Sequence, residues 1–307
     1  MKTLSFLLLA FVVAPAPLAS RADSPAAPQF TDWPAVRSVS GLGVWLSDIE
    51  SRMPAGHIYR DADAVTWAHE TTHGINSRIR QAHASRGRVN GVYVLQGQAV
   101  VFQEPPIRLS DVAATVPAAL RGETFQLYLV QQRQYWENEP LYVLDEWAAY
   151  TNGSLVGMER GVARGESLQF ALEFTAYAFS LCATVERYNQ QHGRSYDDRQ
   201  LKAFTAWHAG RVLWMYDQVR QGRYPAMRRA GQDQYFARMQ AEDGLNRFCA
   251  WYLGWAVRGW KPTSTMTQED RPCRAGGKLL ERLRERGEAR GARWRRCLLH
   301  PPRRGSR

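Results

Sequence analysis

The sequence predicts a mostly helical α+β fold, with a small β-sheet or hairpin in its first half and a helical C-terminal half. Apolar residues recur at three- and four-residue spacing over residues 62–83, which is typical of an amphipathic helix. Two β-branched and aromatic runs within residues 91–102 are separated by Gln96-Gly97, a pattern typical of a β-hairpin. Beyond Gly153 the sequence predicts long amphipathic helices and has no repeat of fixed period.

Residues 1–22 have the features of a signal peptide. Lys2 supplies the positive start, and Leu4–Ala14 is apolar but too short to span a bilayer. Small residues then predict cleavage near Ser20 or Ala22; a retained anchor is the alternative. We therefore expect a secreted or periplasmic protein, and no later segment is expected to be a transmembrane helix.

The remaining chain suits one large domain, or one domain with appendages, because 45% of the 307 residues are hydrophobic and can form a core. Residues 23–56 are expected to be a proline-rich leader and the segment that leads into this core. Within them, residues 36–53 predict a short strand and a turn at Gly41-Leu42-Gly43. His57 then lies in the loop before the first long helix, and it is either close to a functional site or simply solvated.

The helix predicted over residues 62–83 carries a possible metal site. Asp61 and Asp63 precede it, where acidic residues favour a helix start. Within it, His69-Glu70-Thr71-Thr72-His73 has the pattern HExxH. Residues four positions apart share a helix face, so His69 and His73 can bind one Zn²⁺. Glu70 is then placed to act as the general base that activates a zinc-bound water.

A catalytic zinc ion usually has three protein ligands, so a third is needed. The metzincin pattern is not met, because Ile79 stands where that family has its third histidine and Asn76 where it has a glycine. A glutamate on a later helix is the other common solution. Glu146, in the amphipathic segment 141–150, fits this role, and Asp145 is the alternative ligand.

With these residues the chain resembles the gluzincin metallopeptidases, which combine HExxH with a downstream glutamate, often followed three positions later by alanine. Here the glutamate is Glu146 and the alanine is Ala149, so the resemblance covers residues 59–153. It implies a zincin-like catalytic core over residues 57–160. By this resemblance His69, His73 and Glu146 are the ligands of one zinc ion per chain.

The resemblance has one departure. Several gluzincins carry an acidic residue four positions after the glutamate ligand, where it orients a histidine, but Tyr150 is found here. Another group must then orient the histidines, or the third ligand is a different residue. Tyr142 and Tyr150, four residues on either side of Glu146, are candidates for polarising a substrate carbonyl.

The parts around this core are predicted to be largely structural. The hairpin over residues 91–102 either covers the core or offers an edge strand to an extended peptide. The helix that carries Glu146 is expected to end near Asn152-Gly153. Residues 161–262 are expected to be helices packed on the core; His208, on one of them, is either a structural residue or a donor to an oxyanion.

Four cysteines, Cys182, Cys249, Cys273 and Cys297, suit an exported protein with two disulfides. Three pairings are possible, and we expect Cys182–Cys249 and Cys273–Cys297; a free Cys182 in the core is the alternative. Their spacing does not resemble a cysteine zinc site.

Residues 263–307 form a basic tail that is expected to be flexible. Residues 271–307 contain thirteen Lys and Arg against three Glu, whereas the chain as a whole has a net charge of +11, so the body of the protein is nearly neutral. A basic helix is predicted over residues 279–286. The tail suits weak contact with anionic envelope surfaces, and no motif for specific nucleic-acid binding is present.

The sequence thus predicts an exported zinc-dependent metallopeptidase that hydrolyses peptide bonds in peptides or proteins. Glu70 would activate the zinc-bound water and pass its proton to the leaving amine. The alternative is a non-catalytic exported protein that binds zinc, or an envelope-associated binding protein with an adhesive basic tail. No residues define a specificity pocket, so endopeptidase and exopeptidase activity both remain open.

Overall fold

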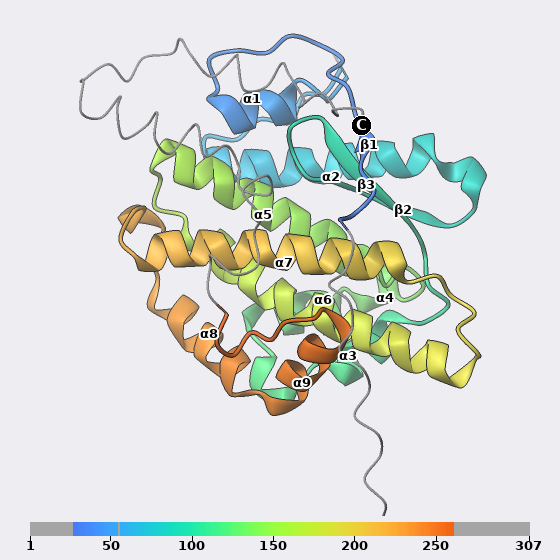
Figure 1. Cartoon of the computed structure of the whole chain (residues 1–307). Coiled ribbons are helices and arrows are strands. Elements are labelled where there is room, and N and C mark those ends of the chain that lie inside the picture. The colour runs from blue at the N-terminus through green and yellow to red at the C-terminus, as the bar shows by residue number, and fades with distance from the viewer. Residues whose placement is uncertain (1–26, 55, 261–307) are drawn as a thin grey trace, which may run out of the picture.

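The computed structural model describes residues 27–54 and 56–260, and it confirms the mostly helical α+β fold (Figure 1). The signal peptide predicted over residues 1–22 and the basic tail over residues 263–307 lie outside the described residues, as does the helix predicted over residues 279–286. The described elements in chain order are β1 (Thr31–Asp32), α1 (Val44–Glu50), α2 (Ala64–Ala82), η1 (Ala84–Arg86), β2 (Val89–Tyr93), β3 (Gln98–Gln103), α3 (Leu109–Thr115), η2 (Ala118–Leu120), η3 (Phe125–Gln131), α4 (Arg133–Trp136), α5 (Tyr142–Arg160), α6 (Gly165–Gln191), α7 (Arg199–Arg220), η4 (Pro225–Met227), α8 (Ala230–Ala241) and α9 (Asp243–Tyr252).

The predicted hairpin is formed by β2 and β3, which pair antiparallel with Val92 opposite Val100. β1 pairs with the other edge of β3, so the sheet order is β1-β3-β2. The turn is stabilised by Asp48 of α1, whose carboxylate accepts hydrogen bonds from the Tyr93 hydroxyl at 2.5 Å and from the Gln96 backbone N–H at 2.9 Å. The sheet is therefore tied to the N-terminal segment as well as to the helices beneath it.

The segment before α2 differs from its prediction. Residues 36–53 do not form the expected strand; they contain α1. The first backbone N–H groups of this helix, at Val44 and Trp45, donate to the carboxylate of Glu159 on α5 at 2.6 and 3.0 Å. Because Glu159 is distant in sequence, this cap could not be anticipated from local residue preferences.

Helices α2 and α5 lie side by side and form the central contact of the first half (Figure 1). Small residues of α5 face α2. A β-carbon on Gly153 would lie 3.1 Å from the Val65 backbone oxygen, and one on Gly157 would lie 3.1 Å from a methyl of Val65. Ala149 is fully buried. This close approach brings side chains from the two helices into one site.

The helix that carries Glu146 was predicted to end near Asn152-Gly153, and this prediction is wrong. This helix, α5, continues to Arg160 and is capped by Gly161, which has a φ of 66°. Asn152 is buried in the helix interior and donates to the Tyr93 backbone oxygen at 3.0 Å. Gly153 gives space to α2. Both residues serve tertiary packing here, although their types favour a helix end.

The second half is helical as predicted, with α6 in its centre and α3, α5, α7, α8 and α9 around it (Figure 1). By length and composition alone α6 could cross a membrane, which differs from the expectation for this part of the chain. However, 83% of its apolar window is buried inside the protein. The apolar character of α6 therefore serves the core of this domain.

The predicted pairing of Cys182 with Cys249 is wrong, since both are free and buried. The Cys182 thiol on α6 lies 3.3 Å from the Thr205 hydroxyl on α7, and burial raises its pKa to about 12. Both thiols therefore act as small core residues. Cys273 and Cys297, the other predicted pair, lie outside the described residues.

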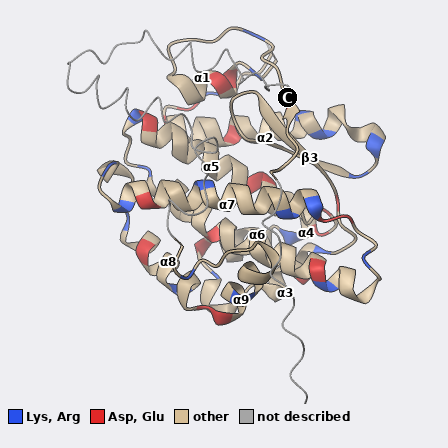
Figure 2. Cartoon of the chain, viewed as in Figure 1, with Lys and Arg blue, Asp and Glu red and all other residues tan. Residues whose placement is uncertain are grey.

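Acidic and basic residues are interspersed over the described helices, and no element carries a block of one sign (Figure 2). This agrees with the near-neutral charge expected for the body of the protein.

The contact between β2 and α2 leads to a first prediction. A β-carbon on Gly91 of β2 would lie 2.2 Å from a methyl of Ile79 on α2. Gly91→Ala is therefore expected to lower the free energy of unfolding by about 1–3 kcal/mol through overpacking. Gly56→Ala is the matched control, because nothing lies within 4 Å of its β-carbon position. Equal denaturant midpoints for the two variants would show that the sheet does not pack on α2 in this way.

Candidate metal centre

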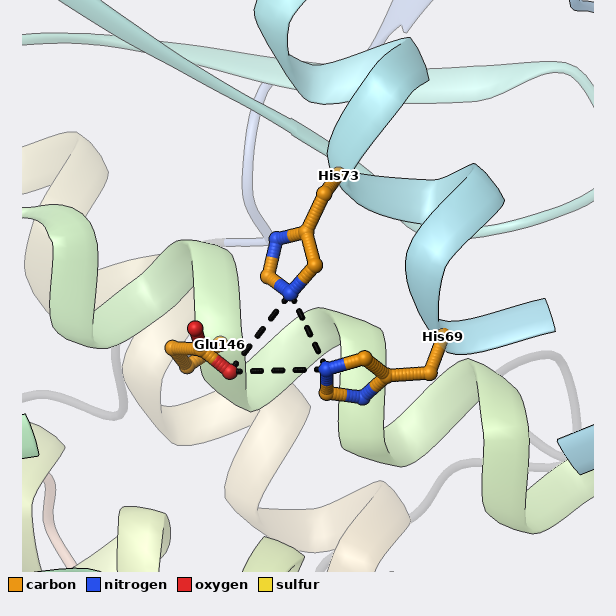
Figure 3. Close-up of side chains that lie close together, drawn as sticks. All are labelled: His69, His73 and Glu146. Carbon is orange, nitrogen blue, oxygen red and sulfur yellow. Dashed lines mark hydrogen bonds and ion pairs between the residues drawn. The ribbon is translucent and has the colours of Figure 1, made fainter. Parts of the chain in front are cut away.

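The HExxH residues lie on α2, which starts almost where it was predicted. The side chain of Asp63 accepts hydrogen bonds from the backbone N–H groups of Val65 and Thr66, so it caps the helix. His69 and His73 follow one turn apart on the face that meets α5 (Figure 3). Glu146 reaches the same point from α5.

These three side chains form a group that can hold a metal ion (Figure 3). The Nε2 atoms of His69 and His73 lie 3.0 Å apart. One carboxylate oxygen of Glu146, Oε2, lies 3.6 Å from the Nε2 of His69 and 3.5 Å from that of His73. The carboxylate is nearly inaccessible, and its Oε2 has no hydrogen-bond partner among the described residues.

The spacing of the three atoms fits a tetrahedral metal. Bonds of about 2.0–2.2 Å to nitrogen and oxygen in tetrahedral geometry place neighbouring ligand atoms about 3.3–3.6 Å apart. The observed separations of 3.0, 3.5 and 3.6 Å are close to these values. A buried carboxylate oxygen without a hydrogen bond is costly, and a bound cation would remove that cost.

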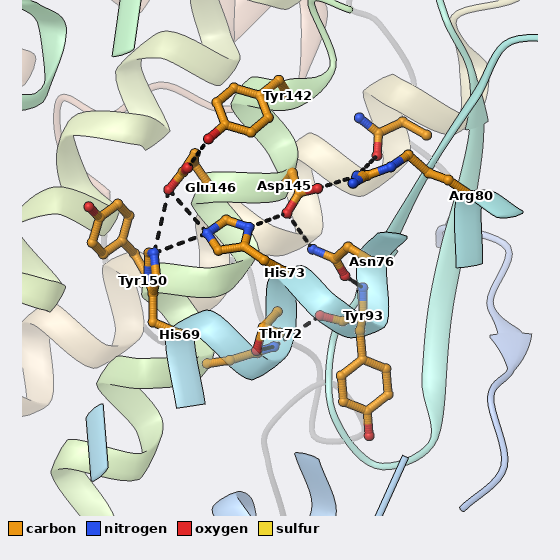
Figure 4. Close-up of polar contacts among 12 residues, drawn as sticks. His69, Thr72, His73, Asn76, Arg80, Tyr93, Tyr142, Asp145, Glu146 and Tyr150 are labelled. Atoms are coloured by element: carbon orange, nitrogen blue, oxygen red, sulfur yellow. Dashed lines mark hydrogen bonds and ion pairs between the residues drawn. The ribbon is translucent and has the colours of Figure 1, made fainter. Parts of the chain in front are cut away.

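Asp145 orients His73, the role for which no group was identified in the sequence. Its Oδ1 accepts a hydrogen bond from the Nδ1–H of His73 at 2.7 Å (Figure 4). In the neutral ring, this bond favours the tautomer in which Nε2 carries the lone pair, as a metal ligand requires. Asp145, the alternative third ligand in the sequence, thus faces the outer nitrogen of His73, and Glu146 faces the inner one.

Two further residues of α2 hold Asp145 in place. The side-chain amide of Asn76 donates to Asp145 Oδ1 at 2.7 Å, and the Arg80 guanidinium is paired with Oδ2 (Figure 4). The Asn76 side-chain oxygen in turn accepts from the backbone N–H of Tyr93 at 2.7 Å. A continuous set of hydrogen bonds therefore connects β2 to the histidine.

Burial and the charges of this network shift the pKa values of the two histidines in opposite directions. Burial disfavours the protonated form of His73, but Asp145 and Glu146 outweigh it and raise its pKa well above the ordinary value. Burial and the neighbouring His73 lower the pKa of His69 to about 4. Burial would raise the pKa of Asp145, but the charges and hydrogen bonds of His73 and Arg80 lower it. Asp145 is therefore an ionised partner for His73.

The other carboxylate oxygen of Glu146, Oε1, is held by a tyrosine. The Tyr142 hydroxyl donates to Glu146 Oε1 (Figure 4). The Tyr142 ring is stacked on Trp136 with centroids 3.9 Å apart. Tyr142 was a candidate for polarising a carbonyl, but in this arrangement its hydroxyl is used to hold the carboxylate. Oε2 is left facing the histidines.

A cavity of about 300 Å³ adjoins the group and contains Glu70. Glu70 is exposed, and no hydrogen bond or ion pair joins its carboxylate to another described residue. Tyr150 lies beside His69 with ring centroids 4.3 Å apart, and its hydroxyl is 2.7 Å from that of Tyr128. Burial and Glu146 raise the pKa of both tyrosines, so they are neutral phenols that can donate hydrogen bonds.

His57 lies elsewhere, at a buried carboxylate on the opposite face of α2. Its Nε2 is 3.6 Å from Glu50 Oε1. Glu50 also accepts from the Trp67 indole at 2.6 Å and is paired with Arg37 and Arg60. This cluster attaches α1 and the preceding loop to α2.

His208 on α7 is buried beneath α5, where its Nε2 lies 2.9 Å from the Thr151 hydroxyl and its ring packs on Trp147. It does not line the cavity. These contacts support the prediction that His208 is a structural residue.

No role at the site was predicted for Asn76, Arg80 or Tyr128. Asn76 and Arg80 follow His73 by three and seven positions, so they share its helix face, and this spacing was the available signal. Tyr128 had no such signal. It lies on η3, which is a π-helix, and π-helices often occur at functional sites.

Comparison with protein-family models, with curated proteins and with solved structures found no match for this chain.

The hydrogen bond from His73 to Asp145 leads to a second prediction. Asp145→Asn replaces an ionised acceptor by a neutral amide, and it is expected to lower zinc affinity about 10- to 100-fold. Affinity is measured by competition with a chelator. Asp217→Asn is the matched control, because Asp217 is also buried and paired with an arginine, but on α7. Equal affinities in the two variants would show that Asp145 does not support the metal ligand.

Proposed function

We propose that this chain is a zinc-dependent metallopeptidase, with zinc bound by His69, His73 and Glu146 and with Glu70 as the general base. The observation that carries the proposal is the convergence of the three ligand atoms beside a cavity that contains a free carboxylate. Two imidazoles and one carboxylate are a ligand set typical of catalytic zinc, which keeps a position open for water. The resemblance to gluzincins in HExxH and the downstream glutamate supports the same conclusion.

When bound, zinc would lower the pKa of a water molecule and polarise the carbonyl of the scissile bond. Glu70 takes a proton from the attacking water and delivers it to the leaving amine. Its lack of a described partner supports this role, because the carboxylate is free to accept and release a proton. Burial of Glu146 and its contact with Tyr142 keep the third ligand fixed while Glu70 acts.

The hydroxyl pair of Tyr128 and Tyr150 is proposed to stabilise the developing oxyanion, because one hydroxyl donates to the other and the second keeps its hydrogen free to donate to the oxyanion. Both residues line the cavity beside His69 and Glu70, and both are neutral. Neutral donors fixed near a developing negative charge lower the barrier for attack on a carbonyl. In this proposal the hydrogen-bond donor to the oxyanion comes from the tyrosine pair of η3 and α5. Tyr142 instead holds the carboxylate of Glu146.

The substrate is proposed to be a peptide or protein outside the cytoplasm. The signal-peptide features of residues 1–22 support export. The basic residues after residue 270 suit weak contact with anionic envelope surfaces.

The role of Glu70 leads to a third prediction. Glu70→Gln is expected to keep zinc and to lower kcat for peptide hydrolysis about 10²- to 10⁴-fold, because the amide cannot accept the proton. The measurement is turnover of a mixed peptide library by zinc-loaded protein. Glu139→Gln, an exposed glutamate outside the cavity, is the control. Full activity in Glu70→Gln would assign the base to another group, and hydrolysis that persists after zinc removal would contradict the metallopeptidase.

A further inference from the structure

The cavity beside the metal centre has the form of a pocket that extends away from the reacting atoms. It follows the first two turns of α2, from Asp63 to Glu70, and is closed by Tyr150 of α5, Tyr128 of η3 and the start of α6. His69 and Glu70 lie at one end, and Asp63 and Arg164 lie at the other. At 1.5 Å per residue, the six positions from Asp63 to His69 span about 9 Å.

The walls of this pocket are aromatic. Phe170 on α6 meets Tyr150 edge to face with centroids 5.3 Å apart, and Tyr128 completes the surface. The polar atoms of these residues are partly engaged with one another and with the backbone. The Tyr128 and Tyr150 hydroxyls pair with each other at 2.7 Å, and the Ser167 hydroxyl donates to the Tyr150 backbone oxygen at 3.0 Å. The pocket therefore offers aromatic surface to a ligand beside about as much polar surface, and part of that polar surface is charged.

The charges around the pocket cancel in pairs. Arg164 is 3.1 Å from Asp63, and Glu166 is paired with Arg229. Glu70 is the one ionised lining residue without a described partner, and it lies at the metal end. A charged substrate group in this pocket would lose water without gaining a partner, whereas a large uncharged group would gain from burial.

We propose that this cavity is the specificity pocket of the enzyme and that it accepts one bulky uncharged side chain, aromatic or aliphatic, from a residue that flanks the scissile bond. The inference rests on the proposed function and adds its substrate class. A volume of about 300 Å³ suits a single large side chain, since it is at the small end of the range for ligand pockets. Phe170 of α6 and Thr66 of α2 both line the pocket.

The test uses the zinc-loaded full chain and peptides that differ only in the residues flanking the cleaved bond: Phe, Leu, Gly, Asp or Lys. Wild type is expected to cleave the Phe and Leu peptides with a kcat/KM about 10- to 100-fold higher than the others. Phe170→Ala is expected to reduce this preference about tenfold. Thr66→Leu adds volume to the lining from α2, and it is expected to slow cleavage of the Phe peptide more than that of the Gly peptide.

Tyr135→Ala is the control, because Tyr135 is an exposed aromatic residue that does not line the pocket, and it should cleave like wild type. Cleavage without preference, a preference for Asp or Lys, or an unchanged preference in both pocket variants would overturn the inference and leave the peptidase intact. If wild type cleaves none of these peptides and no member of a random library, the proposed function fails and the inference fails with it.

Discussion

The close approach of α2 and α5 is the constraint on which the candidate metal centre depends. His69 and His73 come from one helix and Glu146 from the other, so a shift between the helices would separate the three ligand atoms. The approach is possible because Gly153 and Gly157 leave space for Val65. The packing of small residues between the two helices therefore sets the distances between the three candidate ligand atoms.

The same helix pair carries a balanced set of buried charges. Asp145 is stabilised in its ionised form by His73 and Arg80, and it fixes the nitrogen of His73 that faces the metal position. Asn76 extends this connection to the backbone of β2. Removing any one partner would leave a buried polar group without its hydrogen bond, so the network is expected to be rigid. A rigid outer set of contacts would keep the candidate ligands in position.

The features that depend on local sequence were predicted well. The spacing of His69 and His73 predicts one helix face, Asp63 predicts the start of that helix, and the two apolar runs predict the hairpin. Features that depend on tertiary contacts were not. Asn152-Gly153 favours a helix end in isolation but serves the contact with α2 and β2 within α5. The partners of Asp145 could be recognised only once the two helices were placed together, because 65 positions separate it from Arg80.

Metal content tests the account most directly. Zinc in the purified chain is measured by elemental analysis for wild type and for Glu146→Gln, after both have been exposed to zinc and freed of excess ion. The account predicts about one zinc per wild-type chain and little or none in Glu146→Gln, since the amide is a poor replacement for the carboxylate ligand. Absence of zinc from wild type, or equal zinc in both proteins, would contradict a centre built from His69, His73 and Glu146.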